Sequence, residues 1–262
     1  MRITTWNVNG LRAALRKGFD EVLQRIDPDV LLLQEVRSRP EQLPAQWQNP
    51  EGWHVHWHPA DKPGYSGTAI WSRQPIKILS LGHGDATSAL DAGDPEGRLI
   101  LAKTGGIQVA SVYLPSGSSG DHRQAQKDLW LDAFSRWAAP VFRARTPTIL
   151  GGDFNIAHTE NDIFHAKSNQ NTSGFLPHER EWIGQLFESG WRDFVREQVG
   201  HQPGPYTWWS NRGRARELDR GWRIDYLLGN TSAAKIAGRA SIDRTAALTV
   251  SDHAPVTIEL DA

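Results

Sequence analysis

The sequence predicts an α/β fold in which two β-sheets pack face to face and helices cover the outside. Short apolar runs rich in β-branched and aromatic residues recur along the chain, whereas helical spacing is confined to three segments. Strands and helices do not alternate strictly, which argues against a Rossmann fold. No repeat or long linker divides the 262 residues, a length that suits one large domain or two small ones.

The apolar runs are the expected strands. Gly105-Gly106 separates two of them and is typical of a tight hairpin turn. The last run alternates apolar and polar side chains from Val256 to Leu260, which predicts a half-buried strand. The runs cover residues 2–8, 29–36, 53–58, 67–72, 76–81, 98–104, 107–114, 147–152, 206–210, 222–228 and 254–260.

Three segments carry apolar side chains at the spacing of one helix face, three or four residues apart. The first spans residues 11–26 and is followed by Pro28. The second spans residues 130–141, and the third spans 182–187 with Gly190 as its stop signal. The Trp and Phe side chains of these segments are expected in the core.

The composition excludes several classes of protein. With 29 basic and 30 acidic residues the net charge is −1, so any nucleic-acid contact must come from a local patch. The absence of Cys excludes a disulfide scaffold, a thiolate metal site and a cysteine nucleophile. No secretory h-region and no membrane-length apolar run is found, so a cytoplasmic protein without a membrane partner is expected.

Polar side chains at the ends of the apolar runs are the candidate functional residues, because a sheet holds such side chains rigidly at an open rim. Asp225 lies inside the run 222–228, where a buried carboxylate needs a cationic or hydrogen-bonding partner, for which a His is one candidate. Taken singly, the others also suit turns, caps or solvated loops. They are Asn7, Asn9, Glu35, Tyr113, Asp153, Asn155, Asp252 and His253.

The chemistry of this set points to metal-assisted phosphodiester hydrolysis. Carboxylates without Cys suit a hard cation such as Mg²⁺, and Asn, Tyr and His side chains donate hydrogen bonds to phosphoryl oxygens. A general base alone accelerates a reaction about 10²- to 10⁴-fold, which is less than enzymes achieve. A base, a metal and several donors around one phosphate are therefore expected.

Seven motifs in order resemble the exonuclease III family of apurinic/apyrimidinic (AP) endonucleases, within the endonuclease/exonuclease/phosphatase superfamily. The resemblance runs from Arg2 to about Leu260. It implies one domain over residues 1–262, folded as a four-layered α/β/β/α sandwich with two packed mixed sheets flanked by helices. The motifs are WNVNGLRA (6–13), LQE (33–35), GYSG (64–67), GGDFNIA (151–157), GFLP (174–177), GWRIDY (221–226) and SDHAPV (251–256).

The resemblance implies a role for each rim residue. Glu35 would be the main ligand of Mg²⁺, with Mn²⁺ as an alternative ion, helped by Asn9 or by Asp252 through water. Asn9 stands where relatives carry Asp, so the metal site would have one negative charge less.

The remaining rim residues would act on the water and the phosphate. Asp153 would orient and deprotonate the attacking water, and Asn155 would help to hold it. Asn7 and Tyr113 would contact the phosphate. His253 would donate to a non-bridging oxygen, with Asp225 fixing its orientation and favouring its charged form.

The substrate implied by the resemblance is duplex DNA that lacks a base or carries a blocked 3′ end. Cleavage would fall 5′ to the abasic site, with 3′-phosphodiesterase, 3′-phosphatase and 3′→5′ exonuclease activity besides, as in base excision repair. Trp208, Trp222 and Ile224 match the pocket for the extruded sugar, whereas Trp209 is expected in the core.

DNA backbone contacts are expected from Arg212, Arg37, Tyr65 and Asn169. Arg212 opens a basic segment that ends at Arg220, and a solvated loop is the alternative interpretation of that segment. The protein is expected to be a monomer, associated with the nucleoid through its function.

Two other functions stay open at this stage. An inositol or lipid phosphatase of the same superfamily would share the metal chemistry but leave Trp208, Trp222 and the basic segment unexplained. A non-catalytic RNA-binding regulator need not keep every catalytic residue, and here the set is complete.

Overall fold

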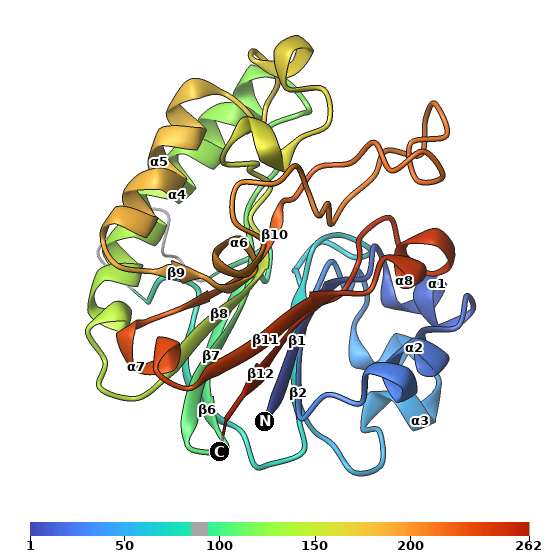
Figure 1. Ribbon diagram of the computed structural model, residues 1–262. Coiled ribbons are helices and arrows are strands. Elements are labelled where there is room, and N and C mark those ends of the chain that lie inside the picture. Colours follow the sequence, from blue (N-terminus) through green and yellow to red (C-terminus); the bar gives the residue numbers. More distant parts are fainter. Residues whose placement is uncertain (85–93, 262) are drawn as a thin grey trace.

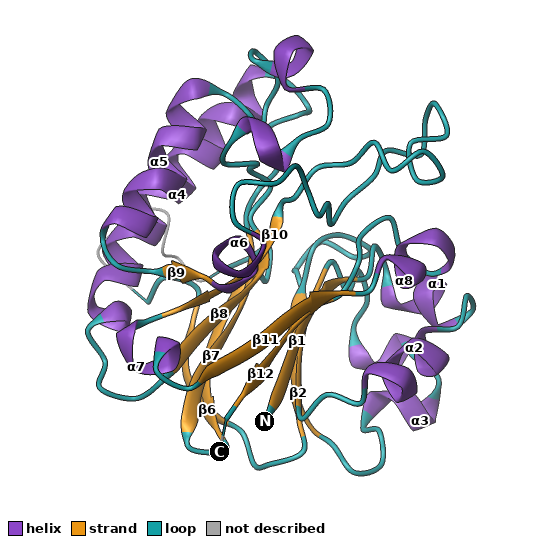
Figure 2. Cartoon of the chain, viewed as in Figure 1, coloured by secondary structure: helices purple, strands orange, loops and turns teal. Residues whose placement is uncertain are grey.

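Two six-stranded mixed sheets lie face to face in the computed structural model, which describes residues 1–84 and 94–261. Helices cover the outer side of each sheet, so the layers follow the order helix, sheet, sheet, helix (Figures 1 and 2). The fold predicted from the sequence is confirmed. Within the described residues no helix is both long enough and apolar enough to cross a membrane.

The first sheet contains the N-terminal strand near its centre. That strand, β1, runs parallel to β2 and antiparallel to β12, so the two ends of the chain meet in one sheet. Its strand order is β11 (Ala237–Ile242), β12 (Val256–Leu260), β1 (Arg2–Asn7), β2 (Val30–Gln34), β4 (Thr68–Ser72) and β3 (His54–His58).

The second sheet is built around the parallel pair β7 and β8. Gly105 and Gly106 join β6 to β7 with φ angles of 53° and 83°, so the expected tight hairpin is confirmed. The strand order is β5 (Lys77–Leu81), β6 (Leu99–Thr104), β7 (Ile107–Tyr113), β8 (Thr148–Asp153), β10 (Asp225–Gly229) and β9 (Arg192–Asp193).

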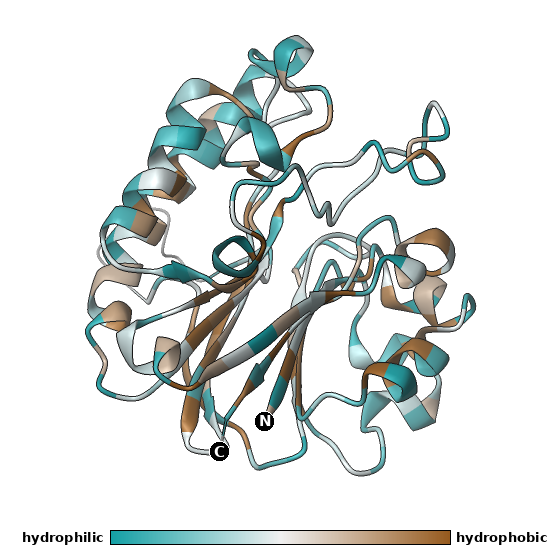
Figure 3. Ribbon diagram, in the orientation of Figure 1, coloured by the Kyte–Doolittle hydropathy of each residue, from teal (hydrophilic) through white to brown (hydrophobic). Residues whose placement is uncertain are grey.

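The helices bury their apolar faces against the sheets. Helices α1, α2 and α8 pack on the first sheet, whereas α4 and α5 pack on the second. Figure 3 shows brown, apolar stretches along the strands and on the sheet-facing sides of these helices. The helices are α1 (Leu11–Leu15), α2 (Phe19–Ile26), α3 (Ala45–Gln48), α4 (Asp121–Phe142), α5 (Pro177–Glu188), α6 (Phe194–Val199), α7 (Thr231–Ala234) and α8 (Arg244–Thr249), with 3-10 turns η1 (Pro40–Gln42), η2 (Glu160–Asp162) and η3 (Ala166–Asn169).

Some predicted elements differ from the structure. The segment 11–26 forms two helices because Gly18, with φ 95°, ends the helical path between them. Residues 206–210 form no regular strand, since Trp208 makes only isolated bridge pairings. In β12 the predicted polar face is only partly exposed, because Thr257 is buried at 7% and only Glu259 is open.

Glycine at position 151 lets the two sheets approach each other. A Cβ atom there would lie 2.6 Å from Leu32 Cδ1 of the facing sheet and 2.9 Å from Leu227 Cδ2. Both distances are shorter than van der Waals contact, and both neighbours are fully buried. The spacing of the sheets directly below the rim therefore depends on this residue.

We predict that Gly151→Ala destabilises the protein by about 1–3 kcal/mol, because the added methyl group overpacks the core between the sheets. Chemical denaturation followed by circular dichroism measures the change. Gly106→Asn is the matched control, since nothing lies within 4 Å of that position and Asn tolerates a positive φ. Equal stability of Gly151→Ala and the wild type would contradict the prediction.

Candidate active site and DNA-binding surface

The predicted residues gather at one rim of the two sheets. Strands β1, β2, β7 and β8 end there, and β10 and β12 begin there. In the second sheet Tyr113 lies opposite Asp153, which in turn lies opposite Asp225, so three neighbouring strands present them side by side. The strand register thus explains why residues so far apart in sequence meet.

Asn7 links the two sheets across the site. Its Nδ2 donates to Glu35 Oε1 at 3.1 Å and to Asp153 Oδ2 at 2.9 Å. The Tyr113 hydroxyl donates to the same Glu35 oxygen at 2.6 Å. Burial, followed by the nearby Glu35 carboxylate, raises the pKa of Tyr113 well above its ordinary value, so the hydroxyl keeps its proton.

His253 is clamped between two carboxylates. Its Nδ1 lies 2.9 Å from Asp225 Oδ2, and its Nε2 lies 3.9 Å from Asp153 Oδ2. Burial by itself lowers the pKa of His253, but the charges of Asp225 and Asp153 outweigh it and raise the pKa to about 10. The expected partner of Asp225 is therefore His253, in its imidazolium form.

The pKa of the Asp153 carboxyl group lies near neutral pH. Burial raises its pKa to about 7, while His253 opposes this rise and Asp225 adds to it. Asn155, with φ 50°, donates its backbone N–H to Asp153 Oδ1 at 2.8 Å and its side-chain amide to Oδ2 at 3.3 Å. These bonds fix the orientation of the carboxylate.

A buried ion pair supports Asn155 from behind. Lys127 donates to the Asn155 carbonyl oxygen at 2.9 Å and to Glu179 Oε1 at 2.6 Å, and neither ionic side chain is exposed. Glu179 also accepts the Gly174 N–H at 2.6 Å. The pair thereby holds the left-handed turn at Asn155. Lys127 and Glu179 both lie outside the helical segments predicted from the sequence, which offered no signal for the pair.

The expected metal ligands lie beside this cluster. Asn9 Nδ2 donates to Asp252 Oδ1 at 2.7 Å, and the Arg37 guanidinium contacts Glu35 Oε2. Asn9, Glu35 and Arg37 all have φ near 50°. Burial tends to raise the pKa of Asp252, but His253 and Asn9 outweigh it and lower the pKa, so a charged oxygen ligand is available.

A second metal arrangement is also present geometrically. Oxygen and nitrogen atoms of Asp153, Asp225 and His253 lie within 4.8 Å of one another. His253, however, carries a proton on each ring nitrogen at neutral pH, and a metal ligand needs a free lone pair. The all-oxygen set of Glu35, Asn9 and Asp252 fits Mg²⁺ better.

An apolar cluster adjoins His253. Trp208 pairs with both His253 and Trp222, and its indole N–H donates to Asp252 Oδ2 at 3.2 Å. Trp208 and Trp222 are partly buried, whereas Trp209 is exposed by only 1%, as expected. The cluster consists of Ala157, Ile163, Ala166, Phe175, Trp208, Trp222 and Ile224.

A basic groove lies beside the expected metal ligands. Its Arg37 was expected from the sequence to contact DNA, but its Arg12 and Arg16 were not anticipated. Arg12, Arg16 and Arg37 line a hollow of about 390 Å³ together with Asn9 and Gly64. The first two lie in and just after α1, where isolated Arg residues look like an ordinary solvated helix face. Only the fold brings them next to Arg37.

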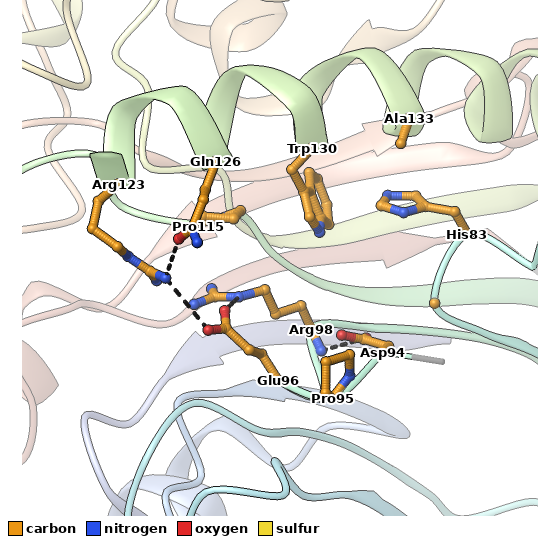
Figure 4. A pocket seen from close by; sticks show the side chains of 11 residues that line it. His83, Asp94, Pro95, Glu96, Arg98, Pro115, Arg123, Gln126, Trp130 and Ala133 are labelled. Carbon is orange, nitrogen blue, oxygen red and sulfur yellow. Dashed lines mark hydrogen bonds and ion pairs between the residues drawn. The ribbon is translucent and has the colours of Figure 1, made fainter. Parts of the chain in front are cut away.

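Tyr65 is fixed by two Arg side chains. Its hydroxyl accepts hydrogen bonds from Arg98 at 3.0 Å and from Arg123 at 2.5 Å. Figure 4 shows both guanidinium groups converging on Glu96, at one side of a hollow of about 240 Å³ beneath α4. Arg98 also donates to the Tyr113 carbonyl oxygen at 3.2 Å, which connects Tyr65 to the rim site.

The other expected DNA contacts lie on loops. Asn169 ends η3, and its amide donates to the His165 carbonyl oxygen at 2.9 Å. Arg212 is exposed. It belongs to the loop of residues 210–221, the orange segment that projects at the right of Figure 1. Within that loop Arg214 pairs with Glu217, and Arg216 contacts the protein itself, so the segment is less uniformly free than expected.

Comparisons with known proteins agree with this geometry. The family model of the endonuclease/exonuclease/phosphatase family matches residues 4–253. The chain is 37% identical to an exodeoxyribonuclease of Bacillus subtilis, covering 98% of each chain. It is 36% identical to the DNA repair nuclease APEX1 of Danio rerio, over 99% of this chain and 82% of that one.

The fold also matches a solved structure. The 3′ phosphatase NExo from Neisseria, bound to a product DNA hairpin, superposes with a TM-score of 0.88 at 31% sequence identity. All of both chains is covered. The likeness therefore includes both sheets and every segment that contributes to the rim.

We predict that His253 stays protonated at pH 8 in metal-free buffer, because its pKa is near 10. Nitrogen-15 NMR of labelled histidine side chains measures this, with His56 and His158 as neutral references since burial lowers their pKa. The ion pair of His253 with Asp225 contributes fully to the free energy of unfolding below pH 6.5. This contribution is lost as the pH rises toward 10.

Asp225→Asn should lower the pKa of His253 sharply, because burial then acts with less opposing charge. A wild-type pKa close to 6.5 would contradict the arrangement.

Proposed function

The chain belongs to the endonuclease/exonuclease/phosphatase family, and from that membership we propose how its rim site acts on damaged DNA. The protein is a DNA-repair nuclease of the exonuclease III type. It cleaves the phosphodiester 5′ to an abasic site in duplex DNA and removes 3′ blocking groups and 3′ nucleotides. The bridge from Glu35 through Asn7 to Asp153, with His253 alongside, carries the proposal.

Asp153 is the general base in this proposal. With a pKa of about 7 it can accept a proton from water near neutral pH, and its two bonds from Asn155 aim the carboxylate. Asn155 would share the attacking water. The buried Lys127–Glu179 pair keeps the Asn155 turn in place during the reaction.

Three donors face the developing negative charge on the phosphate. The His253 imidazolium donates from Nε2, and its Nδ1 is held by Asp225. The Asn7 amide and the Tyr113 hydroxyl, which here bond to Glu35, are the neutral donors. His253 is held in advance and stabilises charge without reorganising, whereas Asn7 and Tyr113 would exchange a bond to Glu35 for one to the phosphate. One well-placed donor contributes about 3–4 kcal/mol.

Mg²⁺ fits the oxygen ligands Glu35, Asn9 and Asp252, and Mn²⁺ accepts the same ligand types. When bound there, the ion would supply Lewis-acid stabilisation to a phosphate oxygen. The hydrogen bond from Asn9 to Asp252 leaves the Asn9 carbonyl oxygen as the ligand atom and holds both side chains in one place.

The apolar cluster suits a sugar without a base. Trp208 pairs with His253, and Trp222 and Ile224 belong to the same apolar cluster, so a deoxyribose turned out of the duplex would meet this cluster beside the reacting phosphate. A missing base lowers the cost of extrusion, which favours abasic sites over intact nucleotides. An inositol or lipid phosphatase would give this cluster no comparable use.

The DNA backbone would follow the basic groove. Arg12, Arg16 and Arg37 supply cations beside the metal ligands, and Arg212 supplies one from the projecting loop. Tyr65 and Asn169 are further proposed backbone contacts. We propose a cytoplasmic monomer that meets its substrate on the chromosome.

Asp153→Asn should lower kcat for incision of an abasic duplex by about 10²- to 10⁴-fold, because the general base is lost. Its Kd for the same duplex should stay within about threefold of the wild type, since no backbone contact is removed. Incision of a labelled oligonucleotide and fluorescence anisotropy measure the two quantities. Asp132→Asn, an exposed change on α4, is the control, and wild-type turnover by Asp153→Asn would refute the assignment.

Glu35→Gln should raise the Mg²⁺ concentration for half-maximal incision by at least about tenfold, because it removes the charge of the principal ligand. Isothermal titration with Mg²⁺ gives the same comparison without turnover. Asp225→Asn should leave the Mg²⁺ affinity nearly unchanged while lowering kcat. The reverse pattern would place the metal in the Asp153, Asp225 and His253 arrangement instead.

A further inference from the structure

An exposed aromatic cluster lies beside the apolar cluster and has no role in the proposed reaction. Phe164 is at its centre and is 46% exposed. Its ring centroid lies 4.6 Å from that of His165 and 6.5 Å from that of Tyr206, and both contacts are edge-to-face. The Arg220 guanidinium lies 5.6 Å from the Phe164 ring centroid.

The cluster is connected to the active site by backbone pairings. Ile163 pairs with Trp222, Trp222 pairs with Trp208, and Trp208 pairs with His253. Neighbouring strands lie about 4.8 Å apart, so three such steps place the cluster roughly 14 Å from His253. That distance is within the reach of DNA only a few nucleotides from the reacting phosphate.

The segment that carries Phe164 is rigid. The Phe164 N–H donates to the Gly221 carbonyl oxygen at 3.0 Å. Two residues earlier, the buried Asp162 accepts from Arg223 Nε at 2.6 Å, and its own carbonyl oxygen accepts the Arg223 N–H at 2.7 Å. Ile163 points into the apolar cluster at 2% exposure, so Phe164 is directed outward. A rigid, outward ring loses little entropy when a flat ligand stacks on it.

Charge and shape together indicate the ligand. The Arg220 guanidinium has no acidic partner among the residues that the structure describes, so it remains free to contact a phosphate. An exposed aromatic face beside such a cation is the combination that binds unpaired nucleobases, whose flat faces stack on the ring while the backbone contacts the cation.

We propose that Phe164, His165, Tyr206 and Arg220 form a stacking platform for an unpaired nucleobase of the DNA near the reacting nucleotide. The proposal rests on the proposed function, because it takes DNA as the ligand. The platform distinguishes DNA with a frayed or overhanging base from fully paired DNA. Stacking on an aromatic side chain typically changes affinity by about fivefold to more than a hundredfold per base.

The test compares two labelled duplexes in buffer with EDTA, where no cleavage occurs. Both contain an abasic analogue, and one also carries an unpaired 2-aminopurine a few nucleotides away. Phe164→Leu keeps an apolar side chain but removes the ring, and Phe164→Tyr keeps the ring. Leu218→Ala, an equally exposed apolar residue at 45% in the neighbouring loop, is the matched control.

Phe164→Leu should weaken binding of the duplex with the unpaired base at least fivefold and abolish the quenching of 2-aminopurine fluorescence. Its affinity for the fully paired duplex should stay within twofold of the wild type. Phe164→Tyr and Leu218→Ala should behave like the wild type. Unchanged binding by Phe164→Leu, or equal loss for both duplexes, would overturn the proposal.

Incision of the paired abasic duplex with Mg²⁺ separates this proposal from the proposed function. Phe164→Leu should incise it within about threefold of the wild-type rate. If the wild-type protein itself failed to incise abasic DNA, the proposed function would be wrong, whatever the stacking measurement showed. A loss of incision in Phe164→Leu alone would assign Phe164 to the reaction and refute the platform.

Discussion

The need to hold Glu35, Asp153 and Asp225 side by side in a largely buried site governs the structure of the rim. Uncompensated carboxylates at such spacing would repel one another and bind protons. The imidazolium of His253 offsets two of them, while Asn7 and Tyr113 donate to the third. Asn7 ends β1, Tyr113 ends β7 and His253 precedes β12, so the charge balance exists only when both sheets are complete.

A polar network below the rim fixes the position of one sheet relative to the other. Gln34 Nε2 donates to Ser111 Oγ at 3.0 Å, and Ser111 Oγ donates back to the Leu33 carbonyl oxygen at 2.9 Å. Thr5 Oγ1 donates to Gln34 Oε1 at 3.2 Å. In a largely apolar core, such directional bonds favour one register, whereas apolar contacts alone would tolerate a slide. The Asn7 bridge depends on that register.

The sequence predicted the strands best where β-branched residues form continuous runs, and it predicted the rim residues because polar side chains end those runs. It missed β11, whose Ala and Gly residues give little pattern, and it mistook residues 206–210 for a strand because Trp208 and Trp209 resemble strand residues. Two features could not be predicted because they depend on contacts between segments that are far apart in the sequence. They are the buried pair of Lys127 with Glu179 and the groove that contains Arg12 and Arg16. The sequence of a helix does not show whether a Lys or Arg side chain is buried, paired or free in the fold.

The placement of β12 beside β1 has a consequence for protein synthesis. Strand β1 leaves the ribosome long before its neighbour β12 and the preceding His253, which are translated some 250 residues later. A nascent chain can therefore neither close its first sheet nor assemble the imidazolium site until residues 253–260 have emerged. A message broken before the codon of His253 therefore encodes a chain that lacks both β12 and the imidazolium beside Asp225.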